Sequence, residues 1–263
     1  MASGLRHRLR TGEPLLGTFV KSHDPNVVEV LATAGYDVLV ADLEHAPLEL
    51  RDLHAIARVG ALHGVATMVR IAPERIGEIG RILESGVSGI QVGGVADAET
   101  LSSMDRAVRF APAGSRGLST SHRGAAFGRI SARAYVEGQA DEVALVAQVE
   151  NAAAIEALPS LLRDAHGPDA WFIGPVDLSC DLGHPGELDH PDVRAAIDAA
   201  SSAVLAAGAR LGSFAARERD AADCFERGVT FVVAGSDLSH LAQRADAVVR
   251  DWRRITDPEQ EGS

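Results

Sequence analysis

The sequence predicts a (β/α)8 barrel, an α/β fold in which parallel strands alternate with helices. Eight short apolar runs recur along the 263 residues, with helical patterns between them. The runs are continuously apolar, as expected of parallel strands that are buried on both faces. Charged and polar side chains collect where the runs end, and in a barrel these ends share one mouth, where catalysis takes place. A doubly wound open sheet is the alternative, but eight regular units favour the barrel.

Local signals mark the elements in order. The first strand is expected at 15–20, and Asp24-Pro25 then begins a helix that Gly35 ends, because aspartate is a favoured N-cap and proline a favoured first helical residue. The later strands are expected at 37–42, 65–70, 89–92, 143–149, 170–173, 209–213 and 229–233. Helices are expected at 48–62, 73–85 and 97–108, and further helical patterns lie between and after the later strands.

Residues 109–141 interrupt this alternation with Pro112, several glycines and a cluster of arginine and histidine. We expect a long, partly helical excursion here, and long loops inside compact domains are often functional. Residues 1–263 are otherwise predicted to form a single barrel domain.

Composition excludes several classes of partner. The net charge of −12 argues against nucleic acid and against an anionic membrane surface. No apolar run reaches the roughly 18 residues of a membrane span, and the basic N-terminus lacks the apolar core of a secretory signal. Cys180 and Cys224 are too few for a disulfide framework. We therefore expect a cytoplasmic protein with reduced thiols.

Two carboxylates are the candidate metal ligands. Asp177 lies just past the strand at 170–173, beside the Gly174-Pro175 turn, and Glu150 ends the strand at 143–149. The amide donors after the proline begin at Val176 and Asp177. Each carboxylate alone could simply stabilise the start of a helix. Together, on neighbouring strands, they suit Mg²⁺ or Mn²⁺ with a chelating substrate.

Other strand ends carry candidates for catalysis. His45 follows Asp42 by three residues, and a carboxylate close enough to orient its ring favours a general acid/base role over a structural one. Arg70 ends an apolar strand, where an unpaired guanidinium is costly to bury. Arg70 could form a salt bridge across the barrel top, or stabilise an oxyanion beside the metal.

Lys21 is the only lysine in the chain and therefore the only residue that could form a Schiff base. It lies at the end of the first strand, but Ser22, His23 and Asp24 are expected to keep its amine solvated and charged. The carboxylates at 150 and 177 would also have no task in an imine mechanism. A metal-dependent mechanism is predicted instead.

Four motifs resemble those of the HpcH/HpaI aldolase family. They are Asp-Leu-Glu-His at 42–45, Arg70, Gln-Val-Glu at 148–150 and Phe-Ile-Gly-Pro-Val-Asp-Leu-Ser at 172–179. The resemblance covers about residues 12 to 250. These proteins are class II pyruvate aldolases of the 4-hydroxy-2-oxoheptanedioate aldolase type, with a barrel of the phosphoenolpyruvate/pyruvate domain type.

The resemblance implies a role for each matching residue. Glu150 and Asp177 would hold Mg²⁺, Mn²⁺ or Co²⁺, which pyruvate chelates. Gly174 and the amides of Val176 and Asp177 would bind the carboxylate, with Gln148 as a further partner. Arg70 would neutralise the enolate oxygen, and Asp42 with His45 would relay the proton. Glu84 would reach a neighbouring subunit's site, in a hexamer built as a trimer of dimers that exchange the last helix.

The function predicted is that of an aldehyde-lyase that cleaves or forms 4-hydroxy-2-oxo acids through a pyruvate enolate and an aldehyde. The alternatives are oxaloacetate decarboxylation, cleavage of an acyl-CoA in the manner of citrate lyase β subunits, and a non-catalytic barrel that binds 2-oxo acids. Gly93-Gly94 replaces a Val-Pro pair usual in the family. This replacement predicts a roomier acceptor side.

Overall fold

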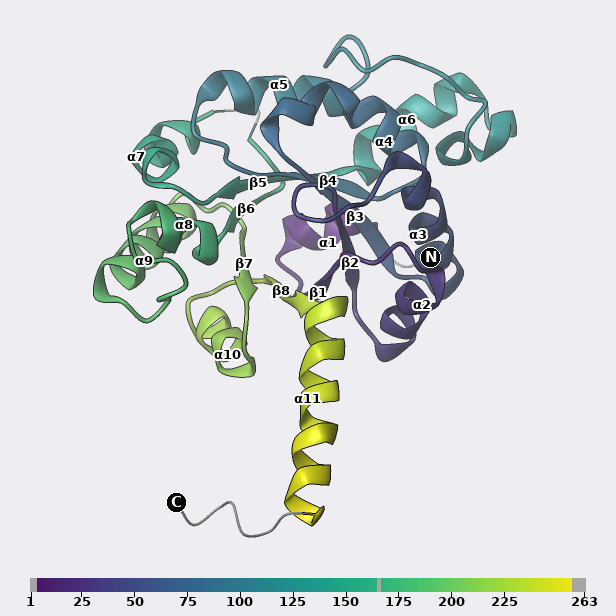
Figure 1. Ribbon diagram of the computed structural model, residues 1–263. Helices are drawn as coiled ribbons and strands as arrows, with labels where there is room; N and C mark the ends of the chain where they lie inside the picture. Colours follow the sequence, from purple (N-terminus) through teal and green to yellow (C-terminus); the bar gives the residue numbers. More distant parts are fainter. Residues whose placement is uncertain (1–3, 165–166, 257–263) are drawn as a thin grey trace.

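The protein, described by a computed structural model over residues 4–164 and 167–256, is a closed barrel of eight parallel strands (Figure 1). The barrel closes because β1 pairs with β8 as well as with β2. This confirms the predicted fold class. The strands are β1 (Leu15–Val20), β2 (Val38–Asp42), β3 (Ala66–Ile71), β4 (Gly89–Val92), β5 (Ala144–Val149), β6 (Ala170–Ile173), β7 (Leu211–Ala215) and β8 (Phe231–Ser236). The predicted domain limits at 1 and 263 lie outside the described residues.

Helices surround the barrel and connect its strands. They are α1 (Leu5–Thr11), α2 (Pro25–Ala34), α3 (Leu50–His63), η1 (Pro73–Glu78), α4 (Ile79–Glu84), α5 (Ala98–Val108), η2 (Arg123–Gly128), α6 (Ala132–Glu142), α7 (Ala152–Leu161), α8 (Pro175–Asp181), α9 (Pro191–Ala206), α10 (Glu218–Glu226) and α11 (Asp237–Thr256). No helix within the described residues has both the length and the apolar character that a membrane span requires.

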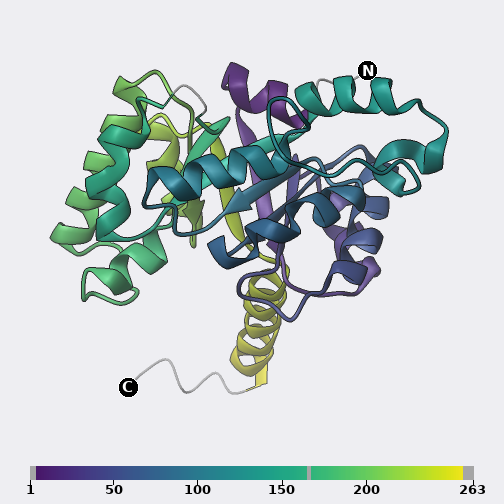
Figure 2. The ribbon, with the colours of Figure 1, turned by 90° about the horizontal axis from the view of Figure 1, so that it is seen from above.

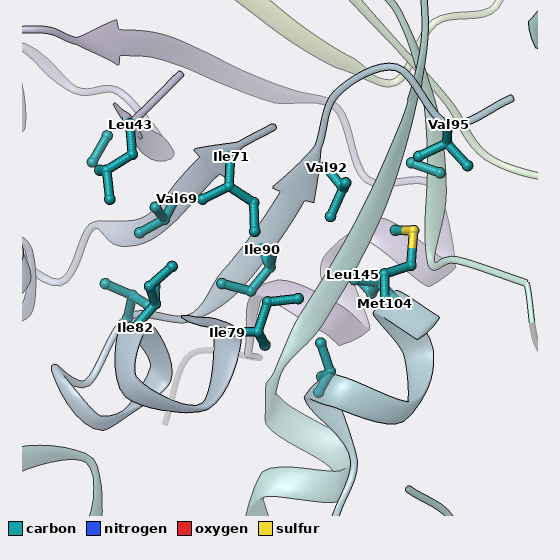
Figure 3. Close-up of a cluster of buried hydrophobic side chains, with 14 of the residues drawn as sticks. Leu43, Val69, Ile71, Ile79, Ile82, Ile90, Val92, Val95, Met104 and Leu145 are labelled. Carbon is teal, nitrogen blue, oxygen red and sulfur yellow. The ribbon is translucent and has the colours of Figure 1, made fainter. Parts of the chain in front are cut away.

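The apolar residues form two separate cores, because successive side chains of a strand point to opposite faces. One core fills the barrel interior and includes Val40, Met68 and Phe231. The other lies between the strands and the helices outside them, where Val69 and other strand residues face the η1, α4 and α5 segments (Figure 3). Burial of the apolar side chains in these two cores supplies most of the free energy that offsets the conformational entropy lost on folding.

The first helix, α1, was not predicted. Leu5 and Leu9 are four residues apart, so they lie on one side of the helix, and both are buried in the core of the barrel interior. Figure 2 shows α1 and α11 at opposite ends of the barrel. The helix therefore closes the end of the barrel that lies away from the mouth.

Several predicted boundaries move in the structure. β7 and β8 begin two residues later than expected, because the chain first completes a helix-ending turn. The amide of Ala209 donates to Val204 O at 3.1 Å, and that of Val229 to Cys224 O at 3.1 Å. The helix expected at 73–85 is divided into η1 and α4, and 3₁₀ turns are frequent at the beginning of helices.

The excursion at 109–141 packs around a buried arginine. The guanidinium of Arg116 donates to Tyr135 Oη at 2.7 Å and to Gln139 Oε1 at 3.0 Å, and its carbon lies 4.6 Å from the centre of the Phe110 ring. These contacts join the start of the excursion to α6. In contrast, α11 leaves the barrel and extends away from it (Figure 1).

Candidate active site

The barrel mouth holds a cavity of about 410 Å³. Its polar wall follows from the strand pleat, because the residue two positions after an interior residue points to the same face. Lys21, Arg70 and Gln148 therefore continue the inward rows of β1, β3 and β5. The cavity is lined by Phe19, Lys21, His45, Arg70, Gln148, Phe172, Gly174, Pro175, Val176, Asp177, Phe214, Ala216, Gly235, Ser236 and Ser239.

Asp42 is fully buried and organises the charges around it. Arg70 donates to it twice, from Nε to Oδ1 at 3.1 Å and from Nη2 to Oδ2 at 2.7 Å, and Lys21 Nζ lies 3.0 Å from Oδ2. Burial alone would raise the pKa of Asp42, but the Arg70 contacts, the His45 amide and Lys21 outweigh it and lower the pKa to about 2. The salt bridge foreseen for Arg70 thus exists, and Arg70 also lines the cavity.

His45 is placed differently from the prediction that Asp42 orients its ring. Asp42 Oδ1 instead accepts from the backbone amide of His45 at 3.1 Å. The imidazole Nε2 lies 3.7 Å from Glu44 Oε2, and the side chain is 50% exposed at the cavity wall. The carboxylate nearest the ring is therefore Glu44, while Asp42 fixes the backbone that carries the ring.

Glu44 is a site residue to which the sequence argument gave no role, although it lies inside the motif at 42–45. Its Oε2 is 3.4 Å from Arg70 Nε and has no hydrogen-bond partner among the residues that the structure describes. Burial, together with the charges of Asp42 and Asp177, raises the pKa of Glu44 against the opposing effect of Arg70 and His45. The signal that could have identified Glu44 was its place between Asp42 and His45, which the sequence analysis did consider.

Glu150 is held by a chain of amide side chains. Gln91, which the sequence argument also passed over, donates to Gln148 Oε1, and Gln148 donates to Glu150 Oε2. Burial and the nearby charge of Glu44 raise the pKa of Glu150 to about 7, with a smaller contribution from Asp177. Burial and neighbouring carboxylates thus disfavour the ionised forms of Glu44 and Glu150.

This donor set fits a divalent cation. Glu150 follows β5 and Asp177 lies in the first turn of α8, directly after β6, so neighbouring strands carry both. Carboxylate oxygens are the ligands that Mg²⁺ and Mn²⁺ prefer. A cation would compensate the mutual repulsion of these carboxylates, and the unpartnered Oε2 of Glu44 provides a further acceptor beside them.

Another group that could hold a metal ion lies between α8 and α9. Donor atoms of His184, His190 and Asp192 fall within 4.8 Å of one another. The two imidazole rings stack with centroids 3.4 Å apart, and His190 Nδ1 accepts the Asp192 amide at 3.3 Å, which caps α9. These contacts stabilise the start of α9, so the group has a structural role there.

The glycine pair after β4 lies against two carboxylates of the site. A Cβ at Gly93 would lie 2.6 Å from Glu44 Oε1 and 3.0 Å from Glu150 Oε1, and Gly94 has a left-handed φ of 57°. Neither residue belongs to the cavity wall. The pair therefore gives clearance to two carboxylates and allows a backbone turn, and the expectation of a roomier acceptor side stays a prediction.

The structure also places three further residues from the sequence analysis, Gly174, Glu84 and Lys21. Gly174 lines the cavity, and a Cβ there would lie 2.9 Å from both Gln148 Nε2 and Glu150 Cβ, so this residue too must be small. Glu84 does not line the cavity of its own chain; its charge acts on Arg116 and Tyr135 in the excursion. The Lys21 amine lies 3.0 Å from Asp42 Oδ2 and its side chain is 26% exposed, so the amine contacts a carboxylate as well as solvent.

Comparison with known proteins gives consistent matches over nearly the whole chain. The family model described as HpcH/HpaI aldolase/citrate lyase matches residues 15–244. The chain is 36% identical to the hydroxypyruvate/pyruvate aldolase of Roseovarius nubinhibens, over 93% of this chain and 95% of that protein. It is 33% identical to the 2-keto-3-deoxy-L-rhamnonate aldolase of Klebsiella pneumoniae, over 94% and 91%. A solved HpcH/HpaI family structure from Burkholderia cenocepacia superposes with a TM-score of 0.88 at 32% identity, over 95% and 98%.

Proposed function

Because this chain belongs to the HpcH/HpaI aldolase/citrate lyase family and its relatives are aldolases, we propose that it is a metal-dependent class II pyruvate aldolase. Its substrates would be 4-hydroxy-2-oxo acids, which it cleaves to pyruvate and an aldehyde or forms from them. The observation that supports this most directly is the crowding of Glu44, Glu150 and Asp177 beside Arg70 at the mouth. A bound cation would compensate the repulsion between these carboxylates, which explains why they lie so close together.

Glu150 and Asp177 would hold the cation, with Mg²⁺, Mn²⁺ or Co²⁺ as candidates. When bound, the metal would act as a Lewis acid on the keto oxygen of the substrate. Gln148 orients Glu150, and Gln91 orients Gln148 in turn. Gly174 leaves space beside these groups, and the first-turn amides of α8, from Val176 and Asp177, have no acceptor within the helix and would bind the substrate carboxylate.

The protein's own groups would carry the proton and the developing charge. In cleavage, the 4-hydroxyl loses its proton to a base, the C3–C4 bond breaks, and its electron pair forms the enolate of pyruvate while the aldehyde leaves. His45 lies at the cavity wall with Glu44 beside it and would move the proton. Arg70, fixed by Asp42, would stabilise the enolate oxygen.

We further propose a cytoplasmic hexamer, built as a trimer of dimers. The exposed apolar residues of α11 support exchange of this helix between subunits. Glu84 lies outside the cavity of its own chain, which fits a contribution to a neighbour's site.

The function is tested by release of pyruvate from a panel of 4-hydroxy-2-oxo acids, before and after EDTA treatment. Oxaloacetate and acyl-CoA esters belong in the same panel, since either as the preferred substrate would favour the corresponding alternative. Failure of every compound to react, combined with tight binding of pyruvate, would identify a binding protein. Borohydride with pyruvate is expected to trap no adduct on Lys21, and a reduced adduct there would overturn the metal-dependent mechanism.

A further inference from the structure

The cluster of two histidines and an aspartate between α8 and α9 takes no part in the chemistry proposed above. His184 belongs to the loop after α8, His190 caps α9, and Asp192 lies in the first turn of that helix. We propose that these three residues form a second metal site, which prefers Zn²⁺ and fastens the loop to the start of α9. This inference goes beyond the proposed function and does not depend on it.

The ligand atoms of the cluster are already spaced for a small cation. Asp192 Oδ2 lies 3.4 Å from His184 Nε2 and 3.8 Å from His190 Nδ1. In a tetrahedron with metal–ligand bonds of about 2.1 Å, neighbouring ligand atoms are about 3.4 Å apart. The two stacked rings would turn apart so that both lone pairs point to the ion. Small side-chain rotations would thus bring three ligands to one ion, with water in the fourth position.

The ligand types distinguish this site from the carboxylates at the barrel mouth. Imidazole nitrogen suits Zn²⁺, whereas carboxylate oxygen suits Mg²⁺ and Mn²⁺. The side chains of His184 and His190 are 26% and 29% exposed, so an ion can reach them from solvent. His190 also lines a cavity of about 560 Å³. Ala216 lines both this cavity and the catalytic one, so the second site would lie beside the mouth.

The loop is fastened firmly to α8 but only weakly to α9. Ser179 is fully buried in α8, where its backbone oxygen accepts the His184 amide at 2.8 Å and its hydroxyl oxygen accepts the Gly186 amide at 2.9 Å. On the other side, His190 Nδ1 accepts the Asp192 amide at 3.3 Å, which is long for a hydrogen bond. An ion that takes this lone pair costs only the weak bond, because an amide at an exposed helix start can bind water instead.

The inference is tested by calorimetric titration of Zn²⁺ into the full-length protein, freed of metal with EDTA and then of EDTA. The background is Glu150→Gln/Asp177→Asn, in which the carboxylates at the mouth are neutralised. His184→Gln and His190→Asn, each added to this background, should weaken Zn²⁺ binding by about tenfold or more, which corresponds to ~1.4 kcal/mol. Asparagine is itself a favoured N-cap, so His190→Asn keeps the cap and removes only the imidazole. The control is His54→Gln, at an exposed position of α3.

Thermal unfolding gives a second measurement. Zn²⁺ should raise the unfolding temperature of the background protein, because an ion that binds the folded state stabilises it, and this rise should be lost in His184→Gln and His190→Asn. Zn²⁺ binding that neither histidine substitution weakens, or that His54→Gln weakens equally, would overturn the inference. Zn²⁺ binding by the wild type that disappears in Glu150→Gln/Asp177→Asn would overturn it too, while supporting the metal site of the proposed function.

Discussion

Individual residues at the mouth act through charge, and Glu150 and Asp177 provide the most direct test. Glu150→Gln and Asp177→Asn keep the size of each side chain but remove an anionic oxygen. Both variants should fold normally and bind Mn²⁺ at least tenfold more weakly in a calorimetric titration, because a cation site is built from charged oxygen ligands. Asp181→Asn, in the last turn of α8, is the control for a nearby exposed carboxylate. Wild-type activity that survives exhaustive EDTA treatment would contradict the prediction.

Arg70 is expected to act mainly in the transition state. Arg70→Ala should lower kcat by ~10²-fold or more, the scale of losing one preorganised partner of a developing oxyanion. Steady-state kinetics on a cleaved 4-hydroxy-2-oxo acid measures this loss, with Arg75→Ala as a control whose guanidinium pairs with Glu78 instead. An effect on KM alone would show that Arg70 contributes only uniform binding.

Asp42 predicts a pH dependence of stability. Its pKa is lowered from 3.8 to about 2 in the folded protein, so the folded state favours its ionised form. The stabilisation, about 2 kcal/mol by linkage, is complete above pH 4 and is lost as the pH falls from 4 towards 2. The difference in unfolding free energy between the wild type and Asp42→Asn should therefore be constant from pH 7 to 5 and shrink below 4. A difference that grows on acidification would have the wrong sign.

The sequence predicted where the candidate site residues lie better than it predicted their partners. Asp42, Arg70, Gln148 and Glu150 were recognisable because each ends an apolar strand, and strand ends meet at one mouth. The pairing of Asp42 with Arg70 depends on the register between β2 and β3, which places these residues side by side. The pairing with Lys21 depends on the neighbouring strand β1. Such non-local geometry has no local sequence signal.

Among the elements, the turn after β4 is expected to require a residue without a side chain at Gly93, and this can be tested. Gly93→Ala would place a methyl group 2.6 Å from Glu44 Oε1 and 3.0 Å from Glu150 Oε1, so one carboxylate must move. We expect weaker Mn²⁺ binding together with lower activity towards every aldehyde tested. Gly138→Ala, in the open on α6, is the matched control. A narrower range of aldehydes with intact metal binding would instead support the expectation that the pair shapes the acceptor pocket.

Strands were predicted more accurately than helices. Each strand lies within a continuous apolar run, so β1, β4 and β6 have their expected limits. The helix α1 was missed because basic residues surround Leu5 and Leu9, and only the barrel interior explains why these two are buried. The late starts of β7 and β8 have a similar cause, since Ala209 and Val229 look like strand residues but complete turns.

At the scale of the whole molecule, α11 presents an apolar stripe that the described residues of its own chain leave exposed. Leu241, Val248, Trp252 and Ile255 recur at helical spacing and are 67, 51, 64 and 73% exposed. The double variant Leu241→Glu/Trp252→Glu should therefore reduce the mass measured by light scattering, because a buried interface does not accept unpaired charges.

Arg250→Glu is the control, since it changes charge on α11 away from this stripe. A wild-type protein that is monomeric at micromolar concentration would contradict the proposed assembly.

The seam between β1 and β8 also has a consequence for the timing of folding during synthesis. The contact of Lys21 with Asp237 spans 216 positions of the chain, so a nascent chain on the ribosome cannot close the barrel until β8 and the start of α11 have emerged. Until then β1 and β7 are open sheet edges, and such edges pair readily with other chains. The enzyme thus acquires its complete mouth only after β8 and the start of α11 have been synthesised. Messages truncated before β8 should yield aggregates rather than partly active protein.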